Sequence, residues 1–194
     1  MAEVKVKKLK VAWGITGAGD KIAEILEVMK DLKKQSEDLV QIDVYLSKAA
    51  ETMLKFYRLD EELNKNFTKV TVESNANSPF LAGMVQSHKY EFLLIMPASS
   101  NTVAKIVNSI SDTLLTNAAL MSLKAFVPVW IMPVDYKEAI IYTKLPNGKE
   151  MKLRVRKEEA EQVRKLEATE DVRVFENPQK LREGFLAWLK TVKS

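Results

Sequence analysis

The stretch FLLIMPASSNT, residues 92–102, decides the fold. Its first five residues form an uninterrupted apolar run, which is typical of a central strand covered on both faces of a sheet. The residues that follow are a proline, small residues, hydroxyl residues and an amide, which break regular structure and supply hydrogen-bonding groups. The stretch therefore predicts a buried strand that runs directly into a polar loop.

Strands and helices alternate on both sides of this stretch. The patterns before it predict strands over residues 8–13, 41–46 and 68–73 and helices over residues 20–34 and 48–57. The patterns after it predict helices over residues 102–108 and 112–125 and a strand over residues 128–132. Such alternation predicts a mostly parallel sheet with right-handed crossovers. The predicted fold class is α/β, a Rossmann-like three-layer αβα arrangement with a doubly wound sheet of about six strands.

The last third of the chain carries an excursion. Residues 138–144 and 150–155 flank Pro146-Asn147-Gly148, and Asn-Gly tolerates the positive φ of a tight turn. We expect a β-hairpin over 138–155 that serves as an oligomer arm, a docking face for an acidic ferredoxin, or a solvated ribbon whose lysines protect its edge. A helix over 157–168, a strand over 172–175 and a closing helix follow, and we expect 1–194 to form a single domain.

Composition excludes several kinds of chemistry. The chain has no cysteine and one histidine, His88, so disulfides, thiolate nucleophiles, iron–sulfur ligands and histidine clusters for a metal are excluded. The apolar run at 125–134 contains two prolines and is shorter than the ~18 residues that span a bilayer. The net charge is +4, but the basic residues are interspersed with acidic ones. The sequence has no stripe of basic residues alternating with aromatic ones, as a nucleic-acid groove would require. We therefore expect a cytoplasmic protein that binds no metal, membrane or nucleic acid.

A glycine-containing loop follows the first predicted strand. Gly14, Gly17 and Gly19 stand between a strand and a helix, and Thr16 adds a hydroxyl. Glycines let backbone N–H groups approach a phosphate, and a helix N-terminus favours negative charge. The spacing fits neither the triphosphate loop nor the dinucleotide fingerprint. A phosphate cradle and a plain turn both remain open on this evidence.

Two further loops reach the same edge of the predicted sheet. Ser47 follows the second strand and suits a helix cap. Ser99, Ser100, Asn101 and Thr102 follow the central strand, and their hydroxyl and amide groups can bind a heteroaromatic ring or a polyol. A cap needs only one such residue, although capping is the simpler reading. In doubly wound sheets ligands bind beyond the carboxyl ends of the strands, where these loops lie.

These loops together resemble a known family, the homo-oligomeric flavin-containing cysteine decarboxylase superfamily. Its Pro-Ala-Ser-Ala-Asn-Thr signature is similar to PASSNT at residues 97–102, and AKI at 104–106 fits as well. The resemblance continues in SDTLLT at 111–116, GITG at 14–17 and SKAA at 47–50. The stretch SNANSPFLAG after the third strand and the lack of cysteine are most similar to the archaeoflavoproteins, the branch related to dihydromethanopterin reductase.

The resemblance implies a noncovalent FMN and a homo-oligomer, a trimer or a multiple of trimers. It implies that Gly14, Thr16, Gly17 and Ala18 hold the phosphate end together with Ser47. It implies that Ser99, Ser100, Asn101 and Thr102 meet the ribityl chain and ring, with Asp112, Leu115 and Thr116 close behind or against the ring. It assigns no catalytic residue.

The chain departs from the decarboxylase pattern of that superfamily. His88 lies nine residues before Pro97, closer than the family pattern, and PVDYKE at 133–138 lacks the Met and Asn of the decarboxylase substrate clamp. Thiol-acid decarboxylation is therefore rejected. Lys105 and Lys124 could contact the isoprenyl phosphate of a flavin prenyltransferase, but helical lysines are usually solvated, so that activity is an alternative.

The remaining hypothesis is an oxidoreductase or electron-transfer protein that uses the flavin itself. The resemblance implies a ferredoxin or an iron–sulfur flavoprotein as electron donor and leaves the acceptor open, with a pterin among the candidates. Tyr136, in a loop after a strand, is a candidate to shield the ring.

Overall fold

The structure is a computed structural model that describes residues 8–145 and 147–193. The strands are β1 (Leu9–Ile15), β2 (Val40–Leu46), β3 (Val70–Val72), β4 (Phe92–Ala98), β5 (Val129–Pro133), β6 (Ala139–Lys144), β7 (Glu150–Val155) and β8 (Val172–Val174). The helices are α1 (Ile22–Ser36), α2 (Lys48–Tyr57), α3 (Asp60–Asn66), α4 (Leu81–Gln86), α5 (Ser100–Val107), α6 (Leu114–Lys124), α7 (Lys157–Glu167) and α8 (Pro178–Lys193).

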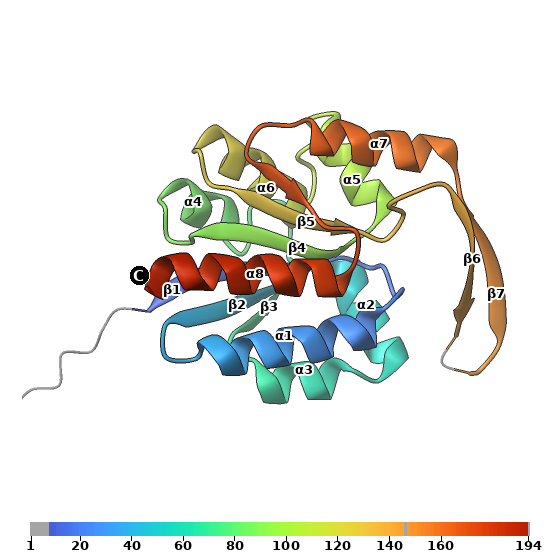
Figure 1. Cartoon of the computed structure of the whole chain (residues 1–194), viewed down its shortest axis with the longest axis horizontal. Helices are drawn as coiled ribbons and strands as arrows, with labels where there is room; N and C mark the ends of the chain where they lie inside the picture. The colour runs from blue at the N-terminus through green and yellow to red at the C-terminus, as the bar shows by residue number, and fades with distance from the viewer. Residues whose placement is uncertain (1–7, 146, 194) are drawn as a thin grey trace, which may run out of the picture.

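Six strands form one parallel sheet. Their order is β3-β2-β1-β4-β5-β8, so the chain winds outward from β1 in one direction and then from β4 in the other. Every neighbouring pair in this sheet is parallel. The strand order therefore reverses between β1 and β4, and the loops at their carboxyl ends open there (Figure 1). This confirms the predicted α/β, three-layer, doubly wound fold.

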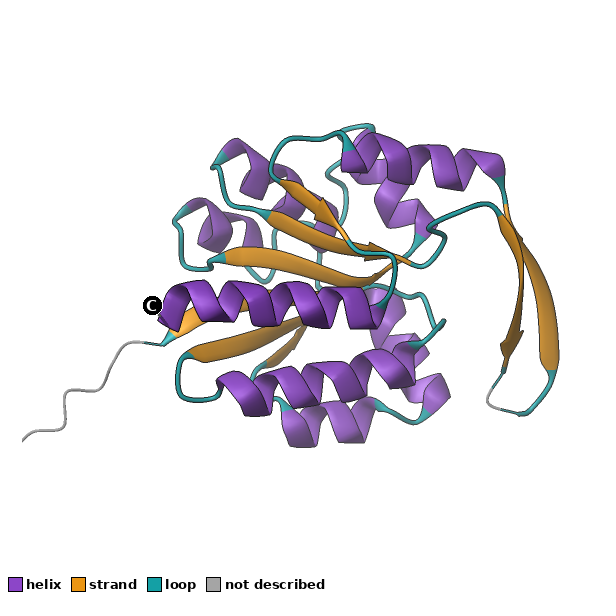
Figure 2. Ribbon diagram, viewed as in Figure 1, coloured by secondary structure: helices purple, strands orange, loops and turns teal. Residues whose placement is uncertain are grey.

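Helices cover both faces of this sheet, as Figures 1 and 2 show. Apolar residues of α1, α2 and α8 pack on one face, where Trp13 and Phe92 are buried with Phe185. Apolar residues of α4, α5, α6 and α7 pack on the other face, around Leu93 and Ile95. Because β4 contributes to both clusters and is buried along its whole length, it is the central strand that its apolar sequence predicts.

The structure corrects several predicted boundaries. β1 extends through Gly14 to Ile15, so Gly14 is a strand residue and not part of the turn. α1 begins at Ile22, later than expected, because Lys21 adopts a left-handed φ of 55°. α5 begins at Ser100, two residues earlier than expected. The short helices α3 and α4 are absent from the prediction.

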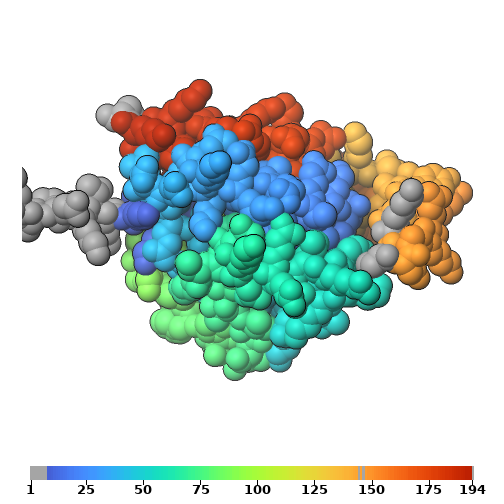
Figure 3. Space-filling view, turned by 90° about the horizontal axis from the view of Figure 1, so that it is seen from below, coloured from blue at the N-terminus to red at the C-terminus, as the bar shows by residue number. Residues whose placement is uncertain are grey.

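The hairpin excursion is confirmed by the antiparallel pair β6 and β7. Pro146, predicted to begin its turn, lies outside the described residues. The hairpin forms a lobe at one end of the molecule (Figure 3), beside the start of α1. Its strands expose large apolar side chains, with Tyr142 70% and Ile140 56% exposed. Within the described residues, no helix is long and apolar enough to cross a bilayer.

Candidate functional site

Thr16 joins the loops that follow β1 and β4. Its backbone N–H and its hydroxyl both donate to the Pro97 carbonyl oxygen, the hydroxyl at 2.7 Å. The Thr16 hydroxyl oxygen in turn accepts from the Ser99 backbone N–H at 3.0 Å. Since its one proton is committed to Pro97, this buried hydroxyl positions the β4 loop and has no proton left for a ligand.

Ser47 brings the loop after β2 to the same place. Its backbone N–H donates to the Ile15 carbonyl at 3.0 Å, which fixes it beside the end of β1. Its hydroxyl accepts from the Ala50 backbone N–H at 3.0 Å, so the predicted N-cap of α2 is confirmed. The three predicted loops therefore meet at one edge of the sheet, which we call the carboxyl edge.

Unpaired backbone N–H groups collect at the carboxyl edge. Those of Gly17 and Ala18 donate to no acceptor among the described residues. A Cβ on Gly17 would lie 2.6 Å from the Cβ of Ala49, so this loop packs directly against the start of α2. Free N–H groups next to helix N-termini favour an anion such as a phosphate.

The first turn of α5 supplies the polar side chains of this edge. The Ser99 hydroxyl caps the helix by accepting from the Thr102 N–H, and it also shares a hydrogen bond with the Thr102 hydroxyl. The Ser100 hydroxyl donates to Asp135 Oδ2 at 2.7 Å. Asn101 is exposed, and its side chain bonds to none of the described residues. The cap therefore needs only Ser99 and Thr102, and Asn101 is free to meet a ligand.

The start of α6 closes another side of the edge. Leu115 lies against Gly14, where an added Cβ would sit 2.6 Å from Leu115 Cδ2. Thr116 is fully buried and forms a capping box with Thr113. Asp112 is exposed and pairs with Lys105 at 2.8 Å. Of these predicted residues, Leu115 and Thr116 shape the edge from within, and Asp112 lies at the surface.

Glu73 is a residue of this region that the sequence did not single out. Its Oε1 accepts from the Leu114 backbone N–H at 2.8 Å, and its Oε2 accepts from the Lys48 backbone N–H at 3.3 Å. One carboxylate thereby satisfies the first N–H groups of both α6 and α2. The sequence places Glu73 at the end of the strand predicted over 68–73, whereas β3 ends at Val72, so its carboxylate directly follows the strand.

His88 and Tyr136 are the two other candidates that the sequence offers. His88 is exposed in the turn between α4 and β4, which is the opposite edge of the sheet. The Tyr136 hydroxyl donates to Glu167 at 2.8 Å, and this bond and partial burial raise the pKa of Tyr136 to about 12. Among the described residues no group of histidine and carboxylate side chains could hold a metal ion.

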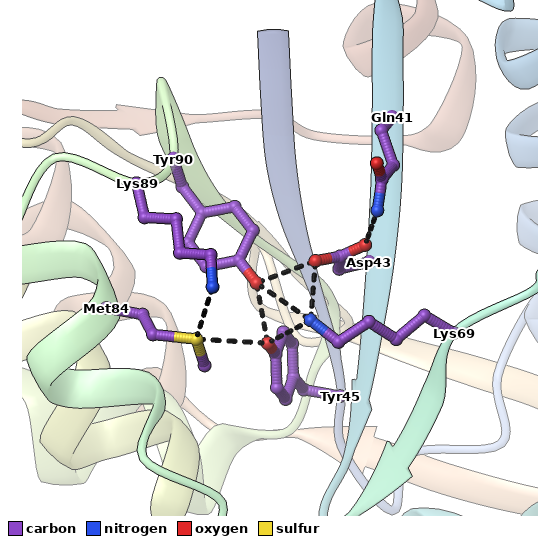
Figure 4. Close-up of polar contacts among 7 residues, drawn as sticks. All are labelled: Gln41, Asp43, Tyr45, Lys69, Met84, Lys89 and Tyr90. Carbon is purple, nitrogen blue, oxygen red and sulfur yellow. Dashed lines mark hydrogen bonds and ion pairs between the residues drawn. The ribbon is translucent and has the colours of Figure 1, made fainter. Parts of the chain in front are cut away.

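A second polar cluster lies inside the molecule, beneath α4 (Figure 4). Asp43 is fully buried and accepts from Lys69 Nζ at 2.6 Å and from the Tyr90 hydroxyl at 2.8 Å. The Tyr45 and Tyr90 hydroxyls are 2.6 Å apart. Burial alone would raise the pKa of Asp43, but hydrogen bonds from Lys69, Gln41 and Tyr90 outweigh it, so the pKa is lowered. Through Lys69 and Tyr90, this cluster joins β2 to the segments that enter β3 and β4.

Fold and edge together define an α/β protein whose doubly wound parallel sheet carries polar loops and unpaired N–H groups at its carboxyl edge. The chain belongs to the Flavoprotein family, whose model matches residues 2–183. It is 42% identical over 185 residues to an uncharacterised protein of Methanocaldococcus jannaschii, covering 95% of this chain and 98% of that protein.

Two named relatives are similar over nearly the whole chain. The dihydromethanopterin reductase (acceptor) of the same organism is 35% identical over 237 aligned positions, covering 91% of this chain and 96% of that protein. The crystal structure of Burkholderia xenovorans DmrB in complex with FMN, described as a cubic protein cage for redox transfer, aligns with a TM-score of 0.81 and 30% identity over 96% of this chain and 98% of that one. These findings confirm the resemblance drawn from the loops, including the branch related to dihydromethanopterin reductase.

Proposed function

We propose that this chain binds FMN at the carboxyl edge and transfers electrons through it. The observation that carries the proposal is that unpaired N–H groups at Gly17 and Ala18 and the free side chain of Asn101 lie on loops that follow neighbouring strands at the same edge of the sheet. One end of this edge suits a phosphate, and the other suits a polyol and a ring. The FMN-bound structure of the 30% identical DmrB supports the same ligand.

Different residues would bind the phosphate end of FMN and its ribityl chain and ring. Gly17 and Ala18 would bind the phosphate by backbone N–H groups, with Gly14 and Ser47 shaping that end. Asn101, Ser99 and Ser100 would meet the ribityl chain and ring, with Leu115 beside them. Thr16, Thr102 and Thr116 are buried, so they would position these groups from behind, and Asp112 would act only through its ion pair with Lys105 of α5. FMN, when bound, accepts and returns one or two electrons.

The reaction we propose is redox transfer from a protein donor to a small acceptor. The donor would be a ferredoxin-like protein or an iron–sulfur flavoprotein, as the resemblance to the archaeoflavoproteins implies. The acceptor would be a pterin, as the names of the relatives suggest. We further propose that residues 1–194 form one domain and that the chain assembles as a homo-oligomer, a trimer or a multiple of trimers, in keeping with the cage formed by DmrB.

Purification and anaerobic titration test this proposal. The protein should be yellow, or should become so with added FMN, and its flavin absorption should bleach with dithionite and with a reduced donor. Reoxidation by a dihydropterin would identify the acceptor class. Mass spectrometry after incubation with dimethylallyl phosphate and reduced FMN separates the alternative, since only a flavin prenyltransferase yields a heavier flavin. A chain that does not bind FMN would refute the proposal.

A further inference from the structure

The hairpin of β6 and β7 has one face that combines cations with large apolar side chains. The antiparallel register places Ile140 opposite Arg154 and Tyr142 opposite Lys152. Because directly opposite residues share a face and alternate residues of a strand do too, these four side chains point the same way. All four are exposed, Ile140 by 56% and Tyr142 by 70%. We call the surface formed by these four residues the basic hairpin face.

The two cations of the basic hairpin face are unpaired. The side chains of Lys152 and Arg154 form no ion pair or hydrogen bond with a described residue, whereas Arg156 and Lys157, just beyond β7, pair with glutamates of α7. Glu150 is the one acid in the sequence of the two strands, and it lies at the far end of the face, next to the turn. Cations without partners attract an acidic surface and repel a basic one.

The opposite face of the hairpin differs in charge and in exposure. It carries no charged residue and consists of Ala139, Ile141 and Thr143 from β6 and Met151, Leu153 and Val155 from β7. Val155 is buried, and Ala139 and Ile141 are partly buried, so this face turns toward the rest of the molecule near the base of the hairpin. The basic hairpin face is therefore the one that turns toward solvent.

Both ends of the hairpin are attached beside the carboxyl edge. Asp135, four residues before β6, accepts from the Ser100 hydroxyl at 2.7 Å. Arg156, directly after β7, lines a hollow together with Ser100 and Asn101. In Figure 1 the hairpin stands at the end of the molecule toward which the strands of the parallel sheet run. A protein bound to the hairpin would therefore be held next to the proposed flavin site.

We propose that the basic hairpin face is the docking site of an acidic electron-donating protein. Carboxylates of that protein would meet Lys152 and Arg154, and Ile140 and Tyr142 would supply the apolar contact. The proposal rests on the proposed function, which includes a protein donor of electrons. Electron-transfer complexes use small interfaces, and charge steers their encounter. Arginine and aromatic residues are enriched at protein interfaces. Two cations attract anionic lipid only weakly, and the face has no row of aromatic side chains to stack on nucleic-acid bases.

The first experiment measures, by stopped flow, how fast a reduced plant-type ferredoxin reduces the FMN-loaded full chain. This probe is a small acidic protein with a single [2Fe–2S] cluster. Each encounter oxidises the cluster by one electron, so two encounters, with protons taken from water, reduce the flavin fully. Lys152→Glu with Arg154→Glu should lower the second-order rate constant at least tenfold and weaken its dependence on salt. Lys152→Arg with Arg154→Lys keeps both charges and should react as the parent does.

The matched control is Lys34→Glu with Lys190→Glu, which changes the net charge by the same amount. Both lysines are exposed, and they lie in the last turns of α1 and α8, at the end of the molecule away from the hairpin (Figure 1). At about 0.1 M salt, charges are screened beyond ~10 Å, so the control should keep the rate within about twofold. Photoreduction by neutral 5-deazariboflavin needs no docking and should be equal in every variant.

A second probe tests the sign of the effect. Cytochrome c is a basic protein that accepts single electrons from a reduced flavin, so the unpaired cations should hinder its approach. Lys152→Glu with Arg154→Glu should therefore speed this reaction at least threefold, although it slows the reaction with ferredoxin. A variant that slows both reactions would show damage to the flavin site instead of a lost docking face and would overturn the proposal.

Calorimetric titration of oxidised ferredoxin into the chain, with and without FMN, separates the two proposals. Binding should be at least tenfold weaker in Lys152→Glu with Arg154→Glu. If ferredoxin binds and reduces the parent and this variant equally, the docking face is wrong and the FMN proposal stands. If no FMN binds but ferredoxin binding depends on the two cations, the flavin proposal fails and the docking face stands.

The same variant also tests other occupants of the basic hairpin face. Light scattering during size-exclusion chromatography should give the mass of the parent, and a smaller assembly would assign the face to a second copy of the chain and overturn the proposal. Binding of DNA or of vesicles with anionic lipid as tight as that of ferredoxin, and lost in the same variant, would overturn it as well.

Discussion

Gly17 is the residue on which the phosphate end of the site depends most directly. Its Cα lies so close to Ala49 that an added Cβ would sit 2.6 Å from the Ala49 Cβ, well inside van der Waals contact. Gly17→Ala should therefore push the loop away from α2 and weaken FMN binding at least about tenfold, or ~1.4 kcal/mol. Fluorescence titration of the variant with FMN measures this.

A compensating substitution distinguishes crowding from other effects at Gly17. The double variant Gly17→Ala with Ala49→Gly removes the opposing methyl and should recover most of the lost affinity. Ala49 is exposed, so its truncation alone should change FMN binding little. Equal losses in the single and double variants would show that the close approach to α2 is not the cause.

Thr16 controls the β4 loop through its hydroxyl. Thr16→Val preserves the shape but leaves the Ser99 N–H without its acceptor and removes one donor from Pro97. The expected cost is about 1–3 kcal/mol in the free energy of unfolding, with weaker FMN binding, because the start of α5 loses its anchor. Urea unfolding and FMN titration of the variant, with Thr16→Ser as control, measure both. A Thr16→Val protein equal to Thr16→Ser in both measurements would contradict this role.

At the scale of elements, the ion pair of Asp43 and Lys69 links β2 to the residue before β3, the outermost strand of the sheet. Asp43 is fully buried, whereas the side chain of Lys69 is 39% exposed. Lys69→Met leaves a buried carboxylate without its cation and should cost about 3–5 kcal/mol in unfolding free energy. Asp43→Asn leaves a lysine that can reach water, so about 1–3 kcal/mol is expected. Urea unfolding of the FMN-free protein tests this order, and the reverse order would contradict it.

The same pair predicts how stability depends on pH. Because the pKa of Asp43 is lower in the folded state than in the unfolded chain, the folded protein binds this proton less readily. Its contribution is therefore complete above the unfolded value of about 4 and is lost as the pH falls toward the folded value. Asp43→Asn should reduce the loss of stability between about pH 5 and pH 3. Unfolding curves across this range measure it, and parallel curves for both proteins would contradict it.

Elements with strong patterns were predictable, and short ones were not. The apolar run of β4 and the amphipathic α1, α2 and α8 follow from periodicity. α3 and α4 have only seven and six residues and lack a side-chain cap, so no local signal marks them. Gly14 was assigned to a turn because glycine usually breaks strands, yet here it is needed inside β1, where Leu115 packs against it.

At the scale of the whole molecule, the loops were predictable as neighbours because parallel strands end at one edge. The roles of single residues at the carboxyl edge were less predictable. Glu73, which joins α2 to α6, depends on two helix starts meeting in space, and the burial of Thr16 and Thr116 depends on packing. Asp135 reaches Ser100 across 35 positions of sequence. Such long-range hydrogen bonds leave no local pattern.

The hairpin should take part in assembly of the molecule. A two-stranded ribbon is only marginally stable in water, and this one exposes Tyr142 and Leu153 on opposite faces. Tyr142→Ser combined with Leu153→Ser should shift the proposed oligomer toward smaller species, with at least a tenfold weaker association. Light scattering during size-exclusion chromatography measures this, with Lys190→Ser as a surface control. An unchanged mass would show that the hairpin has another role.

The most direct test of the central claim is a titration of the flavin-free chain with FMN, followed by absorbance and fluorescence. The account predicts saturation at one FMN per chain, and at least tenfold weaker binding in Gly17→Ala that Ala49→Gly restores. A parent chain that does not saturate with FMN would contradict it. A double variant altered at Gly17 and Asn101 that binds FMN as well as the parent chain would also contradict it.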